Sequence, residues 1–140
     1  MSLLLNLIWI VCGGAWMALG WLVAAIIMAI TIIGIPWARA AVNTAIYTLM
    51  PFGYSAVARD RHTGAEDIGT GAVGFLGNAV WLVLAGWWLA LAHVITAVML
   101  AVTIIGLPFA WAHLKLAGLA LWPVGKMIVP NEDLRRMGRV

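Results

Sequence analysis

Two long apolar blocks dominate this chain and limit what it can fold into. They run from Leu3 to Ala58 and from Gly69 to Val129, and a short charged segment separates them. Of the 140 residues, 65% are apolar and only 9% are charged, whereas a soluble domain carries about 25% charged residues. Such a chain cannot cover a water-facing surface, so we predict an integral membrane protein whose helices lie in lipid.

Each block contains the same interruption, which divides it into two helices. The letters TIIGIP occupy positions 31–36 and TIIGLP positions 103–108, and a glycine followed by a proline is typical of a helix that stops and restarts. The first helix of each pair is about 28 residues long, or roughly 42 Å, which exceeds the hydrocarbon core of about 30 Å. The second is about 15 residues long, or roughly 22 Å, before a second break. The hinge residues at these breaks are Gly34, Pro36, Pro51, Gly53, Gly106, Pro108, Pro123 and Gly125.

The second segments cross the bilayer only by continuing past their breaks, to about Ala58 and Val129. We then expect an all-α integral membrane protein with four spans, arranged as one membrane domain. Its parts are repeat one at 3–58, a cytoplasmic loop at 59–68, repeat two at 69–129 and a cytoplasmic tail at 130–140. The alternative is that the short helices re-enter the membrane or lie in its interface, which leaves two true spans.

Basic residues near the end of the chain predict the orientation. The tail carries Arg135, Arg136 and Arg139, and Lys126 lies close to the last apolar segment. Because positive charges concentrate on the cytoplasmic side of membrane proteins, four spans place both termini in the cytoplasm. The small excess of eight Lys and Arg over five acids is explained by this orientation, so we expect no nucleic-acid partner.

The two blocks are duplicates of one another. Shifting the sequence by 72 residues aligns positions 6–57 with 78–129 without a gap, and 21 of the 52 positions are identical. Apolar composition explains matched Ala, Leu and Ile, but not matched Asn, Trp, Gly and Pro. If each half crosses twice, the halves are related by an axis along the membrane normal, whereas single spans with re-entrant helices would make them inverted.

These repeated motifs also carry a resemblance to a known family. The paired T-I-I-G-I/L-P and M/W-P-F/V-G signatures, with Gly86-Trp87-Trp88 ahead of the second, resemble the YccF-like inner membrane component domain of bacteria. Two tandem copies are present and they cover nearly the whole chain. The resemblance implies a small integral protein of the bacterial inner membrane, and the span count above makes it multi-pass. It brings no established substrate, cofactor or catalytic residue, so the function must come from the residues.

A stripe of small residues lies on one face of each long helix. Gly14 and Ala18 begin the stripe in the first half, and Gly86 and Ala90 repeat it in the second. Small residues let helix backbones approach closely in lipid. The stripe therefore predicts helix packing, either between the two repeats or between copies of a homo-oligomer.

The placement of charge narrows the function. All five acids lie in the loop or the tail, so ion-coupled carriers and acid-lined cation pores, which need intramembrane carboxylates, are disfavoured. Arg39, Asn43 and Tyr47 share one face of the first short helix, and the second short helix carries Lys115 in the place of Asn43, with His113 nearby. Basic groups on interrupted helices favour an anion. The structural alternative is that Arg39 and Lys115 snorkel to lipid headgroups.

The leading hypothesis is an oligomeric channel or transport component for small anions or polar solutes. The alternative is a structural or accessory subunit that packs against another membrane protein or against lipid. A nucleophile with a base and an orienting acid is not found in the apolar segments, the histidines are scattered and Cys12 is alone. We therefore expect no enzyme activity, no metal and no cofactor.

Overall fold

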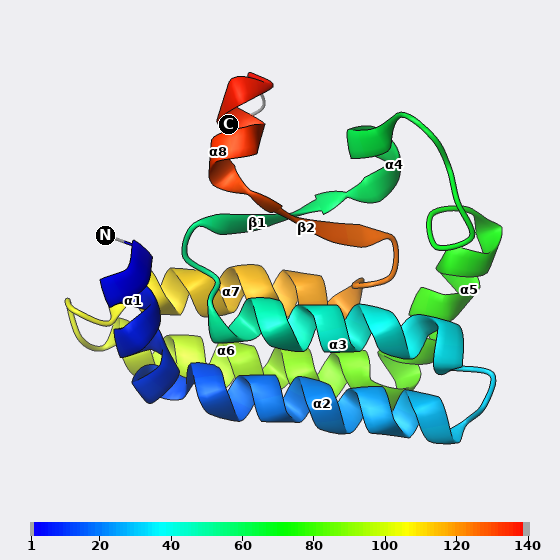
Figure 1. Ribbon diagram of the computed structural model, residues 1–140. Coiled ribbons are helices and arrows are strands. Elements are labelled where there is room, and N and C mark those ends of the chain that lie inside the picture. Colours follow the sequence, from blue (N-terminus) through cyan, green and yellow to red (C-terminus); the bar gives the residue numbers. More distant parts are fainter. Residues whose placement is uncertain (1, 139–140) are drawn as a thin grey trace.

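The computed structural model describes residues 2–138, and helices make up most of it (Figure 1). Both halves have the same order of elements, as expected for duplicates. The tail residue Arg139 lies outside the described residues. The first half contains α1 (Ser2–Trp9), a π-helical turn η1 (Ile10–Gly14), α2 (Ala15–Ile30), α3 (Ile35–Leu49), β1 (Tyr54–Ala58) and α4 (Arg59–Thr63). The second half contains α5 (Ala72–Trp81), η2 (Leu82–Gly86), α6 (Trp87–Ala101), α7 (Leu107–Leu121), β2 (Lys126–Pro130) and α8 (Asn131–Arg136).

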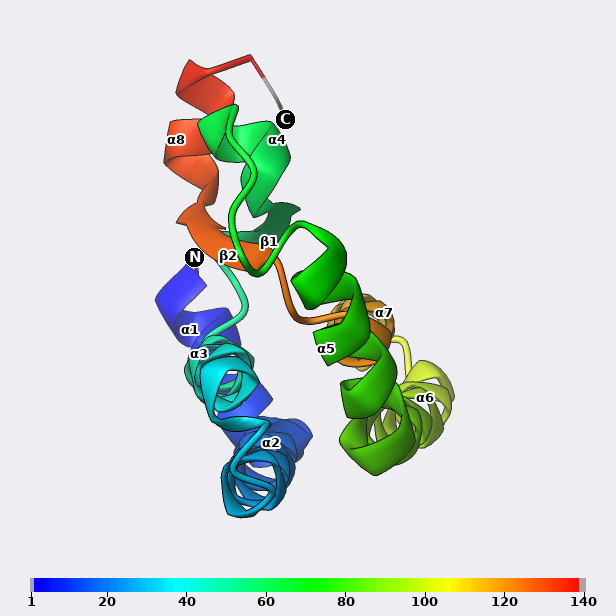
Figure 2. The same ribbon diagram turned by 90° about the vertical axis from the view of Figure 1, so that its right-hand side faces the viewer.

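Each half forms a helical hairpin, and a small sheet joins the halves. Helix α2 packs along α3, and α6 packs along α7. Strands β1 and β2 pair antiparallel, with Tyr54 opposite Pro130 and Ala58 opposite Lys126. The sheet lies over α3 and α7, and α4 and α8 lie beyond it, on the side away from α2 and α6 (Figures 1 and 2).

The short helices end at their second breaks, which corrects the expectation of a purely helical protein. Helices α3 and α7 stop at Leu49 and Leu121, and the residues that were expected to complete the crossings form β1 and β2 instead. Proline and glycine interrupt the helix there, and the β-branched and aromatic residues that follow suit a strand. Four spans are therefore not confirmed. In the described part of the chain, two helices are long and apolar enough to cross a membrane, Ser2–Ile30 and Ala72–Ala101.

A tryptophan in each half holds the end of the short helix. The Trp9 Nε1 donates a hydrogen bond to the Thr48 carbonyl at 2.6 Å, and the Trp81 Nε1 donates to the Ala120 carbonyl at 2.7 Å. Carbonyls in the last turn of a helix have no donor within the helix, and burying one unpaired costs about 1–3 kcal/mol. The duplicated tryptophans therefore pair helix carbonyls that lipid could not pair.

An asparagine in each half closes the following turn. The Asn6 Nδ2 donates to the Phe52 carbonyl and the Asn6 Oδ1 accepts from the Phe52 N–H, both at 3.0 Å. Asn78 makes the same two bonds with Val124, also at 3.0 Å. Each amide side chain thus pairs both backbone groups of one residue between the short helix and the strand, which explains why both asparagines occur at matching positions.

The small-residue stripe makes room for these tryptophans inside each half. A Cβ atom on Gly14 would overlap the Trp9 indole, and one on Gly86 would lie 2.9 Å from the Ala120 carbonyl oxygen and 3.0 Å from Trp81 Nε1. Gly14 and Gly86 are therefore needed for close packing of side chains from their own half.

A polar chain crosses the contact between α2 and α6. The Trp21 Nε1 donates to His93 Nε2 at 3.3 Å, and the Nδ1 atoms of His93 and His113 lie 3.0 Å apart. Both histidines are fully buried. Because His93 Nε2 accepts from Trp21, we infer that its proton lies on Nδ1, which donates to His113 Nδ1. The His113 proton then lies on Nε2, which has no hydrogen-bond partner among the described residues.

Equivalent residues of the two halves meet at two places, and these define an approximate two-fold axis. Ala56 lies opposite Ile128 in the sheet, and Trp21 contacts His93; both pairs are 72 residues apart. A two-fold axis passes between such partners, so this axis runs from the centre of the sheet to the contact between α2 and α6. Helices α2 and α6 run in opposite directions on its two sides (Figure 1).

We predict that Gly14→Ala destabilises the protein, whereas the matched change Gly118→Ala does not. A methyl group at Gly14 overlaps the Trp9 indole, whereas one at Gly118 meets nothing within 4 Å. Overpacking costs about 1–3 kcal/mol, and a free helical Gly→Ala change gains about 0.5–1 kcal/mol. Thermal unfolding of the purified protein in detergent micelles measures both. Equal midpoints for the two variants would contradict the packing role.

We also predict that His93→Leu and His113→Leu are not additive. Each single change leaves the other histidine with an unpaired buried nitrogen, at a cost of about 1–3 kcal/mol. The double variant removes both nitrogens, so its loss of unfolding free energy should be smaller than the sum by about 0.5–3 kcal/mol. A double-mutant cycle in micelles tests this, and simple additivity would show that the histidines do not interact.

Candidate functional site

A cavity of about 530 Å³ lies between α3 and the sheet. Its walls combine apolar side chains with hydrogen-bond donors and two cationic groups, and none of its lining residues is acidic. Such a mixture suits a ligand with an anionic end and an apolar part. The lining residues are Ala40, Asn43, Thr44, Ile46, Tyr47 and Met50 of α3 and the segment after it, Tyr54 of β1, Arg59 of α4, and Lys126, Met127 and Ile128 of β2.

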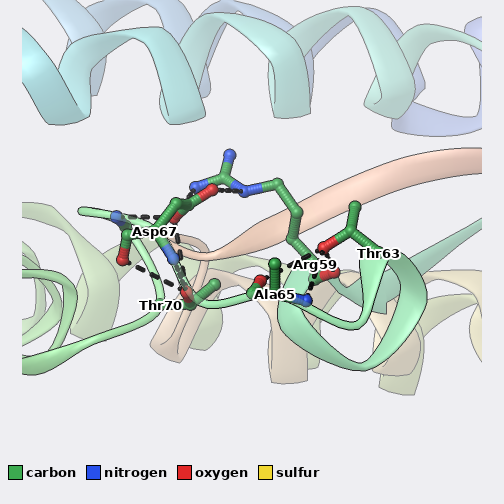
Figure 3. A network of polar contacts seen from close by, with 6 residues as sticks. Arg59, Thr63, Ala65, Asp67 and Thr70 are labelled. Atoms are coloured by element: carbon green, nitrogen blue, oxygen red, sulfur yellow. Dashed lines mark hydrogen bonds and ion pairs between the residues drawn. The ribbon is translucent and has the colours of Figure 1, made fainter.

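The loop after α4 holds Arg59 in the cavity wall (Figure 3). The Arg59 Nη2 donates to Asp67 Oδ1 at 2.7 Å, and the Gly69 N–H donates to the same oxygen at 2.8 Å. The Thr70 hydroxyl accepts from the Asp67 N–H at 2.7 Å. The hydrogen bond from Arg59 is the main reason that the pKa of the Asp67 carboxyl lies below its usual range. The ion pair fixes the guanidinium and compensates part of its charge.

Lys126 supplies the second cationic group, at the first position of β2. Its side chain is half-buried, and its ammonium has neither a hydrogen bond nor an ion pair within residues 2–138. A lysine that meets no carboxylate in a partly buried position attracts anions more strongly than a compensated one. Lys126 is therefore the uncompensated charge of this cavity.

Apart from Lys126 of β2, the polar residues of the cavity belong to the first half, and those of α3 are not repeated in the second. Where α3 has Asn43, Thr44 and Tyr47, α7 has Lys115, Leu116 and Leu119. A smaller cavity of about 60 Å³ shares Tyr47 and Tyr54 with the first one, and Lys115 lines it. Duplication thus kept the framework, whereas the polar lining differs between the halves.

The structure brings Tyr47 together with Asn43 at the large cavity and with Lys115 at the small one, whereas Arg39 and His113 line neither cavity. Asn43 and Tyr47 line the large cavity. Arg39 is exposed on α3 and lines neither cavity. Lys115 lies outside the large cavity and lines the small one with Tyr47. Its Nζ is 5.9 Å from the centroid of the Trp111 ring, a cation–π contact.

His113 belongs to the polar chain inside the helices. Its partner His93 was not among the residues predicted from the sequence. A signal was present, because His93 stands where the first half has Trp21. The exchange replaces a hydrogen-bond donor with a side chain that can also accept, at the place where the two residues meet. In the described residues, no group of three or more His, Cys, Asp or Glu side chains is placed to hold a metal ion. We therefore assign the histidine pair to the structure of the core.

Sequence reasoning also missed Tyr54, Arg59 and Lys126. They lie beyond the second break of each half, and the sheet brings them over α3. A signal is present two positions past the aligned range, where the same shift of 72 residues sets Arg59 of the first half opposite Asn131 of the second. Polar differences between duplicated halves mark positions that the common framework does not require.

Comparison with known proteins gives the family of the chain. Residues 4–54 and 76–126 each match the YccF model, described as an inner membrane component domain. The chain is 34% identical over 133 residues to the inner membrane protein YccF of Escherichia coli K12 and of Shigella flexneri, which covers 94% of this chain and 90% of each relative. No solved structure matches. With two tandem copies of the domain, the chain belongs to the YccF family of bacterial inner membrane proteins.

Proposed function

We propose that this protein is an accessory component of the inner membrane that binds an anionic group of the phosphate class in the cavity between α3 and the sheet. The observation that carries the proposal is the convergence of Arg59 and Lys126 on a cavity whose lining contains no carboxylate. The proposal includes neither a catalytic step nor a cofactor. The accessory role means that the protein acts by contact with lipid or with a second membrane protein.

The donors around the cavity match the oxygens of a phosphate group. Lys126 offers an uncompensated ammonium, and Asn43 and Tyr54 offer an amide and a hydroxyl at the same cavity. Charge-assisted hydrogen bonds from Lys and Arg to phosphate are the strong ones. The apolar wall of Ile46 and Met50 would accommodate the non-polar part of a larger ligand. A lipid headgroup and free phosphate share this chemistry.

We predict that Lys126→Gln weakens anion binding at least about tenfold, because one charged hydrogen bond contributes about 1.5–3 kcal/mol. Lys115→Gln is the matched control, since it removes the same charge from a helix outside the large cavity. Binding of short-chain phosphatidylglycerol and of inorganic phosphate to the purified protein, measured separately by calorimetry, distinguishes the two sources. Equal losses in the two variants, or no binding of either ligand, would refute the proposal.

An oligomeric channel or transport component for small anions or polar solutes is the second candidate. Arg39 and Lys115 are exposed on the matching helices α3 and α7, so contacts between copies of a homo-oligomer would be able to bring them to one pathway. We expect anion flux into liposomes that falls when Arg39→Gln and Lys115→Gln are combined. A protein that conducts no anion, or conducts equally with both changes, would exclude this candidate.

A further inference from the structure

Charge is graded along the approximate two-fold axis of the molecule. At one end, α4, α8 and the loop after α4 carry all five acids. Next come α3 and α7, with a single charged residue each, Arg39 and Lys115. At the other end, α2 and α6 contain no Asp, Glu, Lys or Arg. Figures 1 and 2 show these layers in the same order, with the sheet between the charged helices and α3 with α7.

The uncharged end exposes large apolar side chains at equivalent positions of both halves. Ile26 of α2 is 59% exposed and Val98 of α6 is 62% exposed. The turns between the helices are similar, since Ile33 is 74% and Ile105 is 81% exposed. Apolar side chains exposed over this whole end of the molecule are stable only in contact with lipid or another apolar surface, and the relatives of this chain are inner membrane proteins.

The sheet excludes one way of placing the helices in the bilayer. The axes of β1 and β2 lie roughly parallel to those of α2 and α3 (Figure 1). If these helices crossed the bilayer along their axes, the sheet would lie beside them at the depth of the hydrocarbon. Within residues 2–138 it has two strands, so the outer edge of each strand would be left without partners. Open sheet edges do not occur in contact with hydrocarbon, because their N–H and C=O groups find no water there.

The lengths of the helices lead to the same exclusion. Helices α3 and α7 have 15 residues each, and α2 has 16 after the bend at Gly13, whose φ of 125° breaks the helix. Helix α6 has 15 residues, and α5 meets it at an angle (Figures 1 and 2). Each of these straight segments is roughly 22–24 Å long, shorter than the hydrocarbon core of about 30 Å. The stretches Ser2–Ile30 and Ala72–Ala101 reach a spanning length only when the bent parts α1 and α5 are included.

We infer that the molecule enters the bilayer from one side only, with its two-fold axis along the membrane normal. Helices α2, α3, α6 and α7 then lie close to the membrane plane, and the uncharged face of α2 and α6 is embedded in acyl chains. The sheet, α4 and α8 lie at the surface. The basic residues at that end, among them Lys126, Arg135 and Arg136, assign the surface to the cytoplasm.

In this placement each half enters the membrane, turns and returns to the same surface. Helices α1 and α5 lead from the level of the sheet toward α2 and α6 (Figures 1 and 2). The bend at Gly13 lets the chain turn from α1 into the membrane plane. Both halves then run as hairpins and leave through β1 and β2. The lipid partner is the leaflet that faces the cytoplasm. Both halves have the same orientation in the membrane, and for that case the sequence analysis predicts that an axis along the membrane normal relates them.

Cysteine labelling in cells tests this placement. In a Cys12→Ser background, single cysteines are introduced by Ile33→Cys and Ile105→Cys at the turns, and by Glu66→Cys and Arg136→Cys at the charged end. All four native side chains are exposed. We expect a membrane-impermeant maleimide to label the last two in inside-out vesicles and not in spheroplasts. The turn cysteines should react from neither side and become reactive in detergent.

Four spans make a different prediction, since they place both turns at the periplasmic surface. Labelling of Ile33→Cys or Ile105→Cys in spheroplasts would therefore overturn the inference, as would labelling of Glu66→Cys and Arg136→Cys from opposite sides. Spin labels at Ile26→Cys and Val98→Cys in liposomes add a depth measurement. We expect high collision rates with oxygen and low rates with a water-soluble nickel chelate at both positions, as for acyl-chain contact. High nickel accessibility, or accessibility to neither reagent, would refute embedding in lipid.

Discussion

The architecture depends on pairing backbone groups where α3 and α7 end, because lipid offers these groups no partner. In each half an indole N–H meets a carbonyl in the last turn of the short helix, and an asparagine pairs both backbone groups of the residue after the break. These contacts hold the first and last parts of a half together. They also require the tryptophan to lie close to the long helix, which is possible because Gly14 and Gly86 have no side chain.

Features with a local cause could be predicted from the sequence, whereas features made by distant contacts could not. The helix pairs follow from glycine and proline at positions 34 and 36 and their copies, which act on adjacent residues. The strands are five residues long and pair with one another across the two halves, Tyr54 with Pro130. A segment of that length has no periodicity that separates strand from helix.

The site divides in the same way. Helical spacing places Asn43 and Tyr47 on one face of α3, and both line the large cavity. The same spacing includes Arg39, but Arg39 lies outside the cavity. The part of α3 that lines the cavity begins at Ala40, so the first turns of the helix are not part of the wall. Arg59 and Lys126 reach the cavity through the pairing of β1 with β2, which spacing along a helix does not reveal.

The polar chain at the two-fold axis shows why the duplicated halves differ there. A residue at the axis meets its own counterpart, and an indole can only donate a hydrogen bond. Two tryptophans in the places of Trp21 and His93 would each present a donor. Histidine supplies the acceptor, and its other nitrogen pairs with His113, which stands where the first half has Ala41.

The cavity lies between the layer that holds single basic residues and the sheet at the charged end of the axis. With the axis along the membrane normal, this is the depth at which phosphate groups of the cytoplasmic leaflet lie, above acyl chains and below water. The lining follows the same gradient, since Arg59 and Lys126 come from the elements at the charged end and Ile46 from α3. A free anion needs the cationic part of this lining alone. The apolar wall gives a reason to favour a phosphate that is still attached to lipid.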